Sequence, residues 1–129
     1  MNRVIFLFII FISSCQFFDS SKINIISDSQ FLEIQDTDYI LVDVRTIDEY
    51  ESGHIQNAIN FDFYSESFQK EILSLDKSSL IILYCRTQNR STKTANYLKE
   101  NGYKEISVIE GGITSWVKNG NVLSFNFSE

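Results

Sequence analysis

Short apolar runs alternate along most of the chain with stretches in which apolar side chains recur every three or four residues. The runs have the length of β-strands, and the periodic stretches have the pattern of amphipathic helices. The expected strands lie at residues 23–26, 39–44, 58–61, 80–84 and 105–109. The uninterrupted run at 80–84 is typical of a strand that other elements cover on both faces.

The expected helices lie between these strands, at residues 27–34, 46–52, 65–75, 91–101 and 111–118. Ser27 or Asp28 is suited to cap the first of them. Gly53 and Gly102 follow the second and the fourth, where glycine often ends a helix. Strands that alternate with helices predict an α/β domain with a central, mostly parallel sheet and helices on both faces. The length of 129 residues suits one such domain, which we expect at 22–129.

The first 15 residues differ in pattern from the rest. Arg3 precedes an unbroken apolar run at 4–12, and small residues follow the run. This is the order found in a secretory signal. The run is too short to cross the hydrocarbon core of a membrane as a helix, which takes about 20 residues. The sequence therefore predicts export rather than a permanent transmembrane anchor.

The end of this segment, Ile-Ser-Ser-Cys at 12–15, resembles a bacterial lipobox. The resemblance implies that residues 1–14 are a removable signal peptide, that Cys15 is lipidated, and that 15–21 form a tether to a bacterial membrane. The domain would then lie at the membrane surface, facing the periplasm or the exterior. The alternative is an ordinary secretory signal in which Cys15 has no function.

Charge and residue content argue against two kinds of partner. The formal net charge is −6, and no stripe of Lys or Arg runs through the sequence, whereas a nucleic-acid-binding surface is basic. We therefore expect no nucleic-acid partner. The single histidine, His54, and the one cysteine outside the lipobox-like segment, Cys85, are too few to build a metal site. We expect no metal and no other cofactor.

Cys85 has the surroundings of a reactive thiol. It comes directly after the strand predicted at 80–84 and shortly before the helix predicted at 91–101, where ligands bind in parallel α/β sheets. The free N–H groups of a helix N-terminus, together with Arg86 and Arg90, favour the thiolate form. We expect a nucleophilic sulfur that small molecules can reach. The alternative is a small buried residue that closes the strand.

The spacing in this loop favours sulfur chemistry over phosphate chemistry. Four residues separate Cys85 from Arg90. Cysteine phosphatases use a longer loop, whose backbone amides encircle a phosphate. A tighter ring suits a single sulfur atom. A small phosphatase or an arsenate reductase is the alternative that this spacing disfavours.

Three segments resemble, in order and at similar spacing, the signatures of the rhodanese homology domain, and the resemblance extends over residues 23–120. The segments are 41–60 (LVDVRTIDEYESGHIQNAIN), 84–91 (YCRTQNRS) and 110–116 (EGGITSW). The matching residues outside the cysteine loop are Asp43, Arg45, Glu49, Gly53, His54, Ile55, Ala58, Gly111, Gly112 and Trp116. The resemblance implies a rhodanese-like fold and a sulfurtransferase activity.

The implied reaction passes through a persulfide on Cys85, the implied catalytic residue. Its thiolate takes the outer sulfur of a donor such as thiosulfate and hands it to an acceptor such as cyanide or a thiol. The implied substrate-binding residues are Arg86, Thr87, Gln88, Asn89, Arg90 and Ser91. Arg86 is expected to face solvent and attract anionic donors, and Arg90 to brace the loop. Ser91 is expected to cap the helix or contact the persulfide.

Three residues of the first signature are expected to have structural roles near the loop. Asp43 and Arg45 would hold the fold together, and His54 would be a turn residue hydrogen-bonded to the backbone rather than a general base. Gln88 departs from the family, whose loops commonly carry glycine there. If Gln88 has a positive φ, the strain costs about 1 kcal/mol or more. A non-catalytic rhodanese-like module that binds a partner at the membrane surface is therefore the alternative function.

Overall fold

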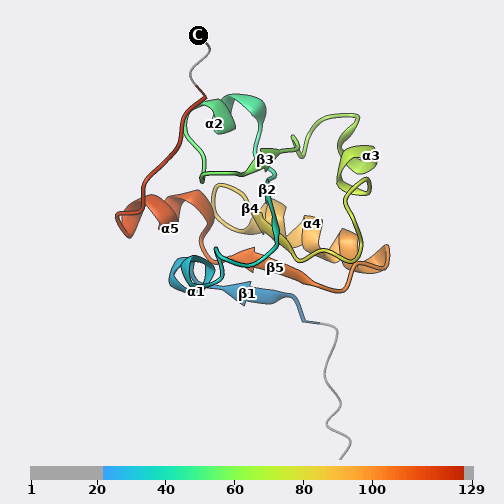
Figure 1. Ribbon diagram of the computed structural model, residues 1–129. Coiled ribbons are helices and arrows are strands. Elements are labelled where there is room, and N and C mark those ends of the chain that lie inside the picture. Colours follow the sequence, from blue (N-terminus) through green and yellow to red (C-terminus); the bar gives the residue numbers. More distant parts are fainter. Residues whose placement is uncertain (1–21, 127–129) are drawn as a thin grey trace, which may run out of the picture.

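The computed structural model describes residues 22–126 (Figure 1). Strands and helices alternate through them in the predicted order. The elements are β1 (Asn24–Ile26), α1 (Asp28–Glu33), β2 (Ile40–Asp43), α2 (Ile47–Glu51), β3 (Ile59–Asn60), α3 (Phe68–Ile72), β4 (Ile81–Tyr84), α4 (Asn89–Glu100), β5 (Ile106–Ile109) and α5 (Gly112–Lys118). Among the described residues, no helix combines the length and the apolar character that a membrane span needs.

The strands form one sheet in the order β1-β5-β4-β2-β3, and all neighbouring strands are parallel. β4 lies in the middle, with Ile82 beside Leu41 of β2 and beside Ser107 of β5. The α/β class with a parallel sheet that the sequence predicts is therefore confirmed.

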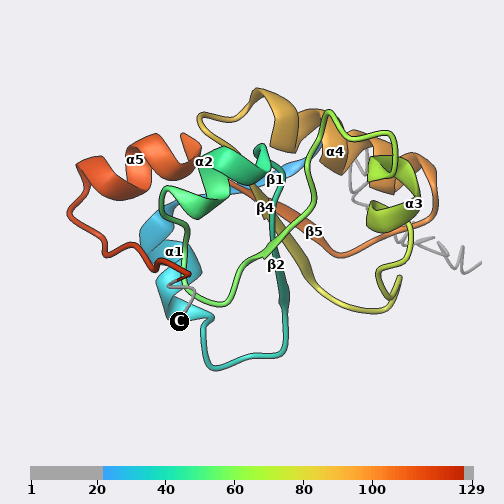
Figure 2. The same cartoon turned by 90° about the horizontal axis from the view of Figure 1, so that it is seen from above.

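The strands send alternate side chains into two hydrophobic clusters, one on each face of the sheet. From β4, Ile81 and Leu83 enter the cluster under α3 and α4, whereas Ile82 and Tyr84 enter the cluster under α1 and α5. Figure 2 shows these two pairs of helices on opposite sides of the sheet. Cys85 continues the alternation and belongs to the cluster under α3 and α4.

The helix α3 is shorter than the helix predicted at 65–75. The Ser65 and Ser67 hydroxyls lie 2.8 Å apart, and the Ser67 N–H donates to the Ser65 hydroxyl. Serine side chains that bond to nearby backbone compete with helix formation. The chain therefore turns before it enters α3 at Phe68.

The C-terminal segment runs from α5 towards α2 (Figure 1). The indole Nε1 of Trp116 donates to the Val122 carbonyl at 2.9 Å. Ser124 then forms an antiparallel bridge with His54, with N–H to carbonyl distances of 3.0 and 2.8 Å. The tail therefore joins α5 to the turn after α2.

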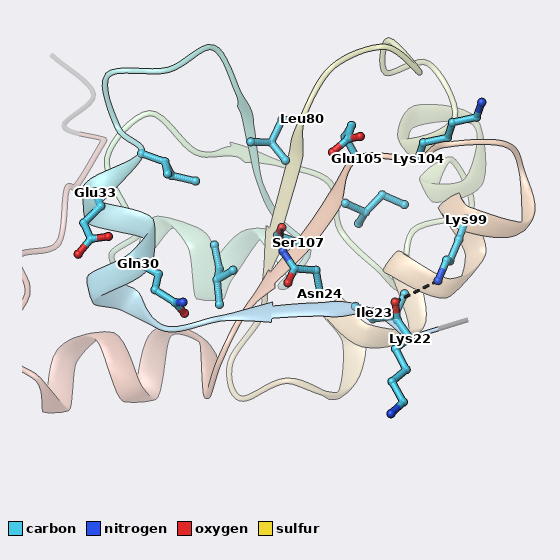
Figure 3. Close-up of a pocket in the computed structure, with 13 residues that line it drawn as sticks. Lys22, Ile23, Asn24, Gln30, Glu33, Leu80, Lys99, Lys104, Glu105 and Ser107 are labelled. Atoms are coloured by element: carbon cyan, nitrogen blue, oxygen red, sulfur yellow. Dashed lines mark hydrogen bonds between the residues drawn. The ribbon is translucent and has the colours of Figure 1, made fainter. Parts of the chain in front are cut away.

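Because the strands are parallel, all of them begin at one end of the sheet and finish at the other. Lys22, where the described chain begins, lines a hollow of about 900 Å³ at the amino end, beside β1, α1 and β5 (Figure 3). There the Lys99 Nζ donates to the Lys22 carbonyl at 3.1 Å. Cys85 follows β4 at the carboxyl end. The described chain thus enters the domain at the end opposite Cys85.

Candidate active site

The loop after β4 is fastened by its carbonyl groups to the first turn of α5. The Ile113 N–H donates to the Cys85 carbonyl at 2.9 Å, and the N–H and hydroxyl of Thr114 donate to the Arg86 carbonyl at 3.1 and 2.9 Å. Gly112 permits this close approach, since a Cβ there would lie 2.3 Å from the Cys85 carbonyl oxygen. Any larger residue at this position would push the loop away from α5.

The same peptide groups direct their N–H bonds away from α5. A peptide group is planar and trans, so a carbonyl that faces α5 places the following N–H on the opposite side. Within residues 22–126, no backbone N–H from Arg86 to Ser91 donates to a protein acceptor. The helix α4 begins at Asn89, earlier than the predicted start at Ser91, so the last of these groups belong to its unpaired first turn. The loop therefore offers free donors at the positive end of a helix dipole.

The sulfur of Cys85 lies 3.4 Å from the Ser91 hydroxyl oxygen. Ser91 donates its proton to the Gln88 carbonyl at 3.0 Å, so the thiol is the donor between Cys85 and Ser91. A thiolate would reverse that bond, because a hydroxyl can turn to donate to it. One of the two roles expected of Ser91 was to cap α4. The cap position is held by Gln88 instead.

Cys85 is buried, whereas the sequence predicts a thiol that small molecules reach. Only 1% of the residue is exposed, and it packs in the cluster that contains Val44 and Phe68. The cause is the alternation of β4, which directs Ile81, Leu83 and then Cys85 towards the same interior. A small molecule contacts the sulfur only after the loop or the neighbouring side chains move.

Arg90 is held by a carboxylate from another helix. Its two terminal nitrogens donate to the two carboxylate oxygens of Glu49, each at 2.9 Å. These hydrogen bonds are the main cause that raises the pKa of Arg90 and lowers the pKa of Glu49. The guanidinium also lies 5.7 Å from the ring centre of Tyr64. The ion pair joins the first turns of α2 and α4.

The remaining loop residues face solvent to different degrees. Arg86, Thr87 and Asn89 are exposed, and Gln88 is half-buried. No carboxylate in residues 22–126 forms an ion pair with Arg86. The loop therefore presents one uncompensated positive charge to solvent, because the charge of Arg90 is matched by Glu49.

Asp43 and Arg45 form a buried ion pair at the carboxyl ends of β2 and β4. The Arg45 Nη2 donates to Asp43 Oδ2 and to the Gly53 carbonyl, both at 2.7 Å. Burial opposes the charge on Arg45, but the hydrogen bonds and charge of Asp43 outweigh it and raise the pKa of Arg45. Burial, and then the charge of Asp43, raise the pKa of Tyr84, whose hydroxyl accepts the Ile55 N–H at 3.0 Å. These contacts suit the structural role expected of the pair.

His54 is engaged by hydrogen bonds away from the thiol. Its Nδ1 donates to the Tyr50 carbonyl at 3.1 Å, and its ring stacks on Tyr50 with centres 3.9 Å apart. Its backbone pairs with Ser124. In the described part of the chain no hydrogen bond joins His54 to residues 85–91. The contacts are those of a turn residue rather than of a general base.

Known proteins share this fold. The rhodanese-like domain family matches residues 28–119, which include Cys85 and the whole loop. The chain belongs to the rhodanese-like domain family.

Its relatives differ in length. A curated relative from Hamiltonella defensa, a tRNA uridine(34) hydroxylase, is 36% identical over 91 residues, which cover 66% of this chain and 25% of the relative. A rhodanese-related protein from Thermoplasma volcanium is 26% identical with a TM-score of 0.72, covering 80% of this chain and 99% of that structure. A rhodanese-like domain protein from Staphylococcus aureus is 26% identical with a TM-score of 0.69, covering 81% and 100%. The rhodanese-like chain thus spans about a quarter of the curated relative but nearly all of the two solved structures.

Gln88, which stands where rhodanese loops commonly carry glycine, does not have a left-handed backbone. Its φ is −158°, so the positive φ considered from the sequence does not occur. The Gln88 Oε1 accepts the Gly111 N–H at 3.2 Å, and the Gln88 carbonyl accepts the Thr92 N–H at 3.0 Å. The side chain therefore joins the rhodanese loop to the turn before α5.

Sequence reasoning missed the partners that hold the loop in place. It matches Glu49 to the first signature but does not pair it with Arg90, and it does not assign Thr114 to the Arg86 carbonyl. The signal for Glu49 was present, because Thr46 is suited to cap α2 and places Glu49 in its first turn. Contacts between segments far apart in sequence are not visible in one sequence, however.

Two expectations concern groups outside this loop. Cys15, the predicted lipidation site, lies outside the described residues. Residues 22–126 bring together no group of three His, Cys, Asp or Glu side chains that would hold a metal ion.

Proposed function

We propose that this rhodanese-like protein is a sulfurtransferase that carries a sulfane sulfur as a persulfide on Cys85. One observation carries this function: α5 binds the loop carbonyls, while the N–H groups of residues 86–91 have no acceptor in the described chain. Free donors that surround a thiol stabilise an anionic sulfur. The same donors suit the terminal sulfur of a persulfide.

In the proposed cycle the Cys85 thiolate attacks the outer sulfur of a donor such as thiosulfate. The S–S bond of the donor breaks, sulfite leaves with the electron pair, and Cys85 becomes a persulfide anion. The hydroxyl of Ser91, 3.4 Å from Sγ, and the loop N–H groups donate to this charge. A nucleophile such as cyanide or a thiol then takes the terminal sulfur, and the thiolate is restored. The two displacements balance without any cofactor.

The two arginines have different roles in this proposal. Arg86 is exposed and has no ion pair among the described residues, so it attracts anionic sulfur donors. Arg90 is matched by Glu49 and braces the loop. The proposed partners are therefore small sulfur-containing anions and thiol acceptors.

The burial of Cys85 adds an opening step to the cycle. With 1% of the residue exposed, the sulfur meets a donor only when covering groups move. The loop carbonyls are fixed to α5, so we expect the movement in the side chains that pack on Cys85 from the side of α3. Tyr64, which is 70% exposed and contacts Arg90, belongs to the segment that leads into α3.

Incubation of the full chain with thiosulfate tests the function directly. We expect the intact mass to rise by one sulfur atom, located at Cys85 by peptide analysis, and cyanide to remove that sulfur as thiocyanate. The Cys85→Ser variant is the control and should show neither. Absence of both products in the unaltered protein would refute the sulfurtransferase function, and hydrolysis of a phosphate ester instead would indicate a phosphatase.

The burial of Cys85 also favours a second candidate, a non-catalytic rhodanese-like binding module. A thiol that is closed off permanently cannot exchange sulfur. Alkylation by iodoacetamide separates the two functions. Labelling of the folded protein at rates well above those of global unfolding supports the enzyme, and protection until the protein unfolds supports the binding module.

We also propose that the chain is exported and held at a bacterial membrane by lipid on Cys15. The lipobox-like segment at 12–15 supports this. The topology predicts how an anchored domain would be oriented. Lys22 and Cys85 lie at opposite ends of the sheet, and β4 alone separates those ends by roughly 13 Å. A tether at the amino end would leave the loop directed away from the membrane, towards donors and acceptors in the aqueous phase.

Mass spectrometry of the mature N-terminus tests this anchor. We expect a lipidated Cys15 in the membrane fraction and release of a Cys15→Ser variant into the soluble fraction. An unmodified Cys15 in the mature protein would refute the proposed lipid anchor.

The name of the curated relative refers to tRNA, but this chain spans 25% of that protein. The net charge is −6, and no stripe of Lys or Arg runs through the sequence, whereas nucleic acid requires a basic surface. We therefore propose that nucleic acid is not a partner.

A further inference from the structure

Glu49 and Arg90 form a two-pronged ion pair between helices that are distant in sequence. Both hydrogen bonds measure 2.9 Å, and the side chains are 32% and 13% exposed. The Thr46 hydroxyl donates to Glu49 Oε1 at 3.2 Å and accepts the Glu49 N–H at 3.3 Å. The carboxylate is therefore held in place by the cap of its own helix before it meets Arg90.

Arg90 stands next to the residue that touches the sulfur. It precedes Ser91 in the first turn of α4, and the Ser91 hydroxyl lies 3.4 Å from the Cys85 sulfur. The hydrogen bonds and charge of Glu49 raise the pKa of Arg90 most, burial opposes them, and the electrostatic interaction with Cys85 raises this pKa further. Changes in the net charge around Arg90 will therefore change the electrostatic potential at the Cys85 sulfur.

Few charged or titratable groups face this part of the loop. The loop itself contributes Arg86, α4 contributes Arg90, α2 contributes Glu49, and the segment before α3 contributes Tyr64. The first turn of α5, which packs on the loop, has no titratable side chain. The turn before α5, whose Gly111 N–H donates to Gln88, also carries the exposed Glu110, which forms no ion pair in the described residues. Glu49 is thus the negative group that acts on the sulfur through Arg90.

We propose that Glu49 is a positioning residue that balances the two halves of sulfur transfer by holding and neutralising the guanidinium of Arg90. This rests on the proposed function. One half is the loading of Cys85 by a donor, and the other is the release of the terminal sulfur to an acceptor. Loading of Cys85 needs enough positive charge to stabilise the thiolate. Too much positive charge would hold the persulfide and prevent the release of its terminal sulfur.

The direction of the effect follows from the charge. Without the carboxylate, Arg90 would present an uncompensated positive charge near the sulfur, and a nearby opposite charge favours the ionised form. Cys85 would then ionise at lower pH and be loaded faster in acidic solution. The persulfide anion would also be stabilised, and stabilising that ground state slows its attack by the acceptor. Loading and release would change in opposite directions.

Three variants and a control test this in the full chain. Glu49→Gln removes the charge but keeps the shape and a hydrogen-bonding oxygen, and Glu49→Asp keeps the charge. Glu49→Gln combined with Arg90→Met removes both charges. Asp48→Asn is the matched control, because Asp48 lies in the same first turn of α2 and has no ion pair in the described residues.

Three quantities are measured for each variant: the pH dependence of Cys85 alkylation by neutral iodoacetamide, the rate of persulfide formation from thiosulfate, and the rate of sulfur release to cyanide. For Glu49→Gln we expect alkylation at acidic pH to be faster by about threefold or more, and release to be slower by a similar factor. Glu49→Asp should lie closer to the unaltered protein than Glu49→Gln does, and the double variant should lose the faster alkylation of Glu49→Gln. Asp48→Asn should stay within about twofold of the unaltered protein. A melting curve shows whether each variant is folded.

Two outcomes would overturn this role. One is a Glu49→Gln variant that matches the unaltered protein in all three quantities, or that slows loading and release together, as a merely structural defect would. The other is an Asp48→Asn variant that shifts the alkylation profile equally, which would show a general charge effect. If Glu49→Gln does not fold, the double variant decides. Alkylation at acidic pH that is faster than in the unaltered protein, with no charge on residue 90 to cause it, would overturn the role.

Failure of this inference is distinguishable from failure of the proposed function. Alkylation needs no sulfur donor, so its pH profile tests the link from Glu49 to Cys85 even if no persulfide forms. Conversely, persulfide formation in the unaltered protein with an unmoved profile in Glu49→Gln would keep the sulfurtransferase and reject the role of Glu49.

Discussion

Replacement of Gly112 by alanine is the most direct test of the way α5 holds the loop. Gly112 has φ +57°, and a Cβ there would lie 2.3 Å from the Cys85 oxygen and 2.5 Å from the Thr87 oxygen, both of them backbone atoms. Gly120 is the matched control: it has φ +82°, and a Cβ there meets nothing within 4 Å. Both substitutions carry the cost of an alanine with a positive φ. Only Gly112→Ala also brings a Cβ into overlap with backbone atoms of the loop.

The structure gives the size of the difference. A left-handed alanine costs about 1–2 kcal/mol, which is the whole effect expected for Gly120→Ala. At Gly112 the overlap must also separate α5 from the loop, which weakens the bonds to the Cys85 and Arg86 carbonyls at about 1 kcal/mol each. We therefore expect Gly112→Ala to lower the free energy of unfolding by about 3–5 kcal/mol.

Urea unfolding followed by tryptophan fluorescence measures both free energies, because Trp116 lies in α5 and is buried. The alkylation rate of Cys85 in the folded state should also rise in Gly112→Ala and not in Gly120→Ala, since only the first displaces the loop. Equal losses of stability in the two variants, within about 0.5 kcal/mol, would refute the close approach of α5 to the loop.

Four further outcomes are expected. Cys85→Ser should abolish sulfur transfer while changing the melting temperature by only a few degrees, as activity and melting assays on the same preparation will show. Arg45→Met should lower the free energy of unfolding in urea by about 3–5 kcal/mol, because it leaves the carboxylate of Asp43 buried without its partner; a loss below about 1 kcal/mol would contradict a buried ion pair. Gln88→Gly should destabilise the protein by about 1 kcal/mol rather than stabilise it, because its φ of −158° leaves no strain to relieve and a hydrogen bond is lost. Folding lowers the pKa of Glu49, so the ionised carboxylate stabilises the folded protein at pH values above its ordinary pKa. This stability is lost as the pH falls through the lowered pKa of the folded state. Urea titrations at a series of acidic pH values should therefore show a smaller loss of stability in Glu49→Gln than in the unaltered protein.

The order of the elements was predictable because its signals are local. The capping box at Ser27, where Ser27 accepts the Gln30 N–H and Gln30 accepts the Ser27 N–H, is visible as residue types three positions apart. The apolar run in β4 is also visible, because it needs no knowledge of its neighbours. The start of α4 was misplaced because its cap, Gln88, makes no side-chain capping bond and so leaves no local signal.

The site was predictable in its membership but not in its geometry. The spacing of Cys85, Arg86 and Arg90 marks the loop, since strand, cysteine and helix follow one another in sequence. The burial of Cys85 depends on the packing of β4 between two layers of helices, and the neutralisation of Arg90 depends on Glu49 of a distant helix. Both are tertiary facts, and both change the chemistry that the motif alone suggests.

The loop lies between two helix N-termini that act on it in different ways. Two N–H groups at the start of α5, those of Ile113 and Thr114, donate to the carbonyls of Cys85 and Arg86, so that end of α5 fixes the loop. The N–H groups at the start of α4 donate to no acceptor in the described chain, and they remain available to an anionic sulfur. Because each peptide group points its two polar atoms in opposite directions, the first interaction enforces the second. A substitution that loosens α5, such as one at Gly112, should therefore disorder the donors around Cys85 without touching the cysteine, and the reactivity of the thiol should depend on α5 as much as on α4.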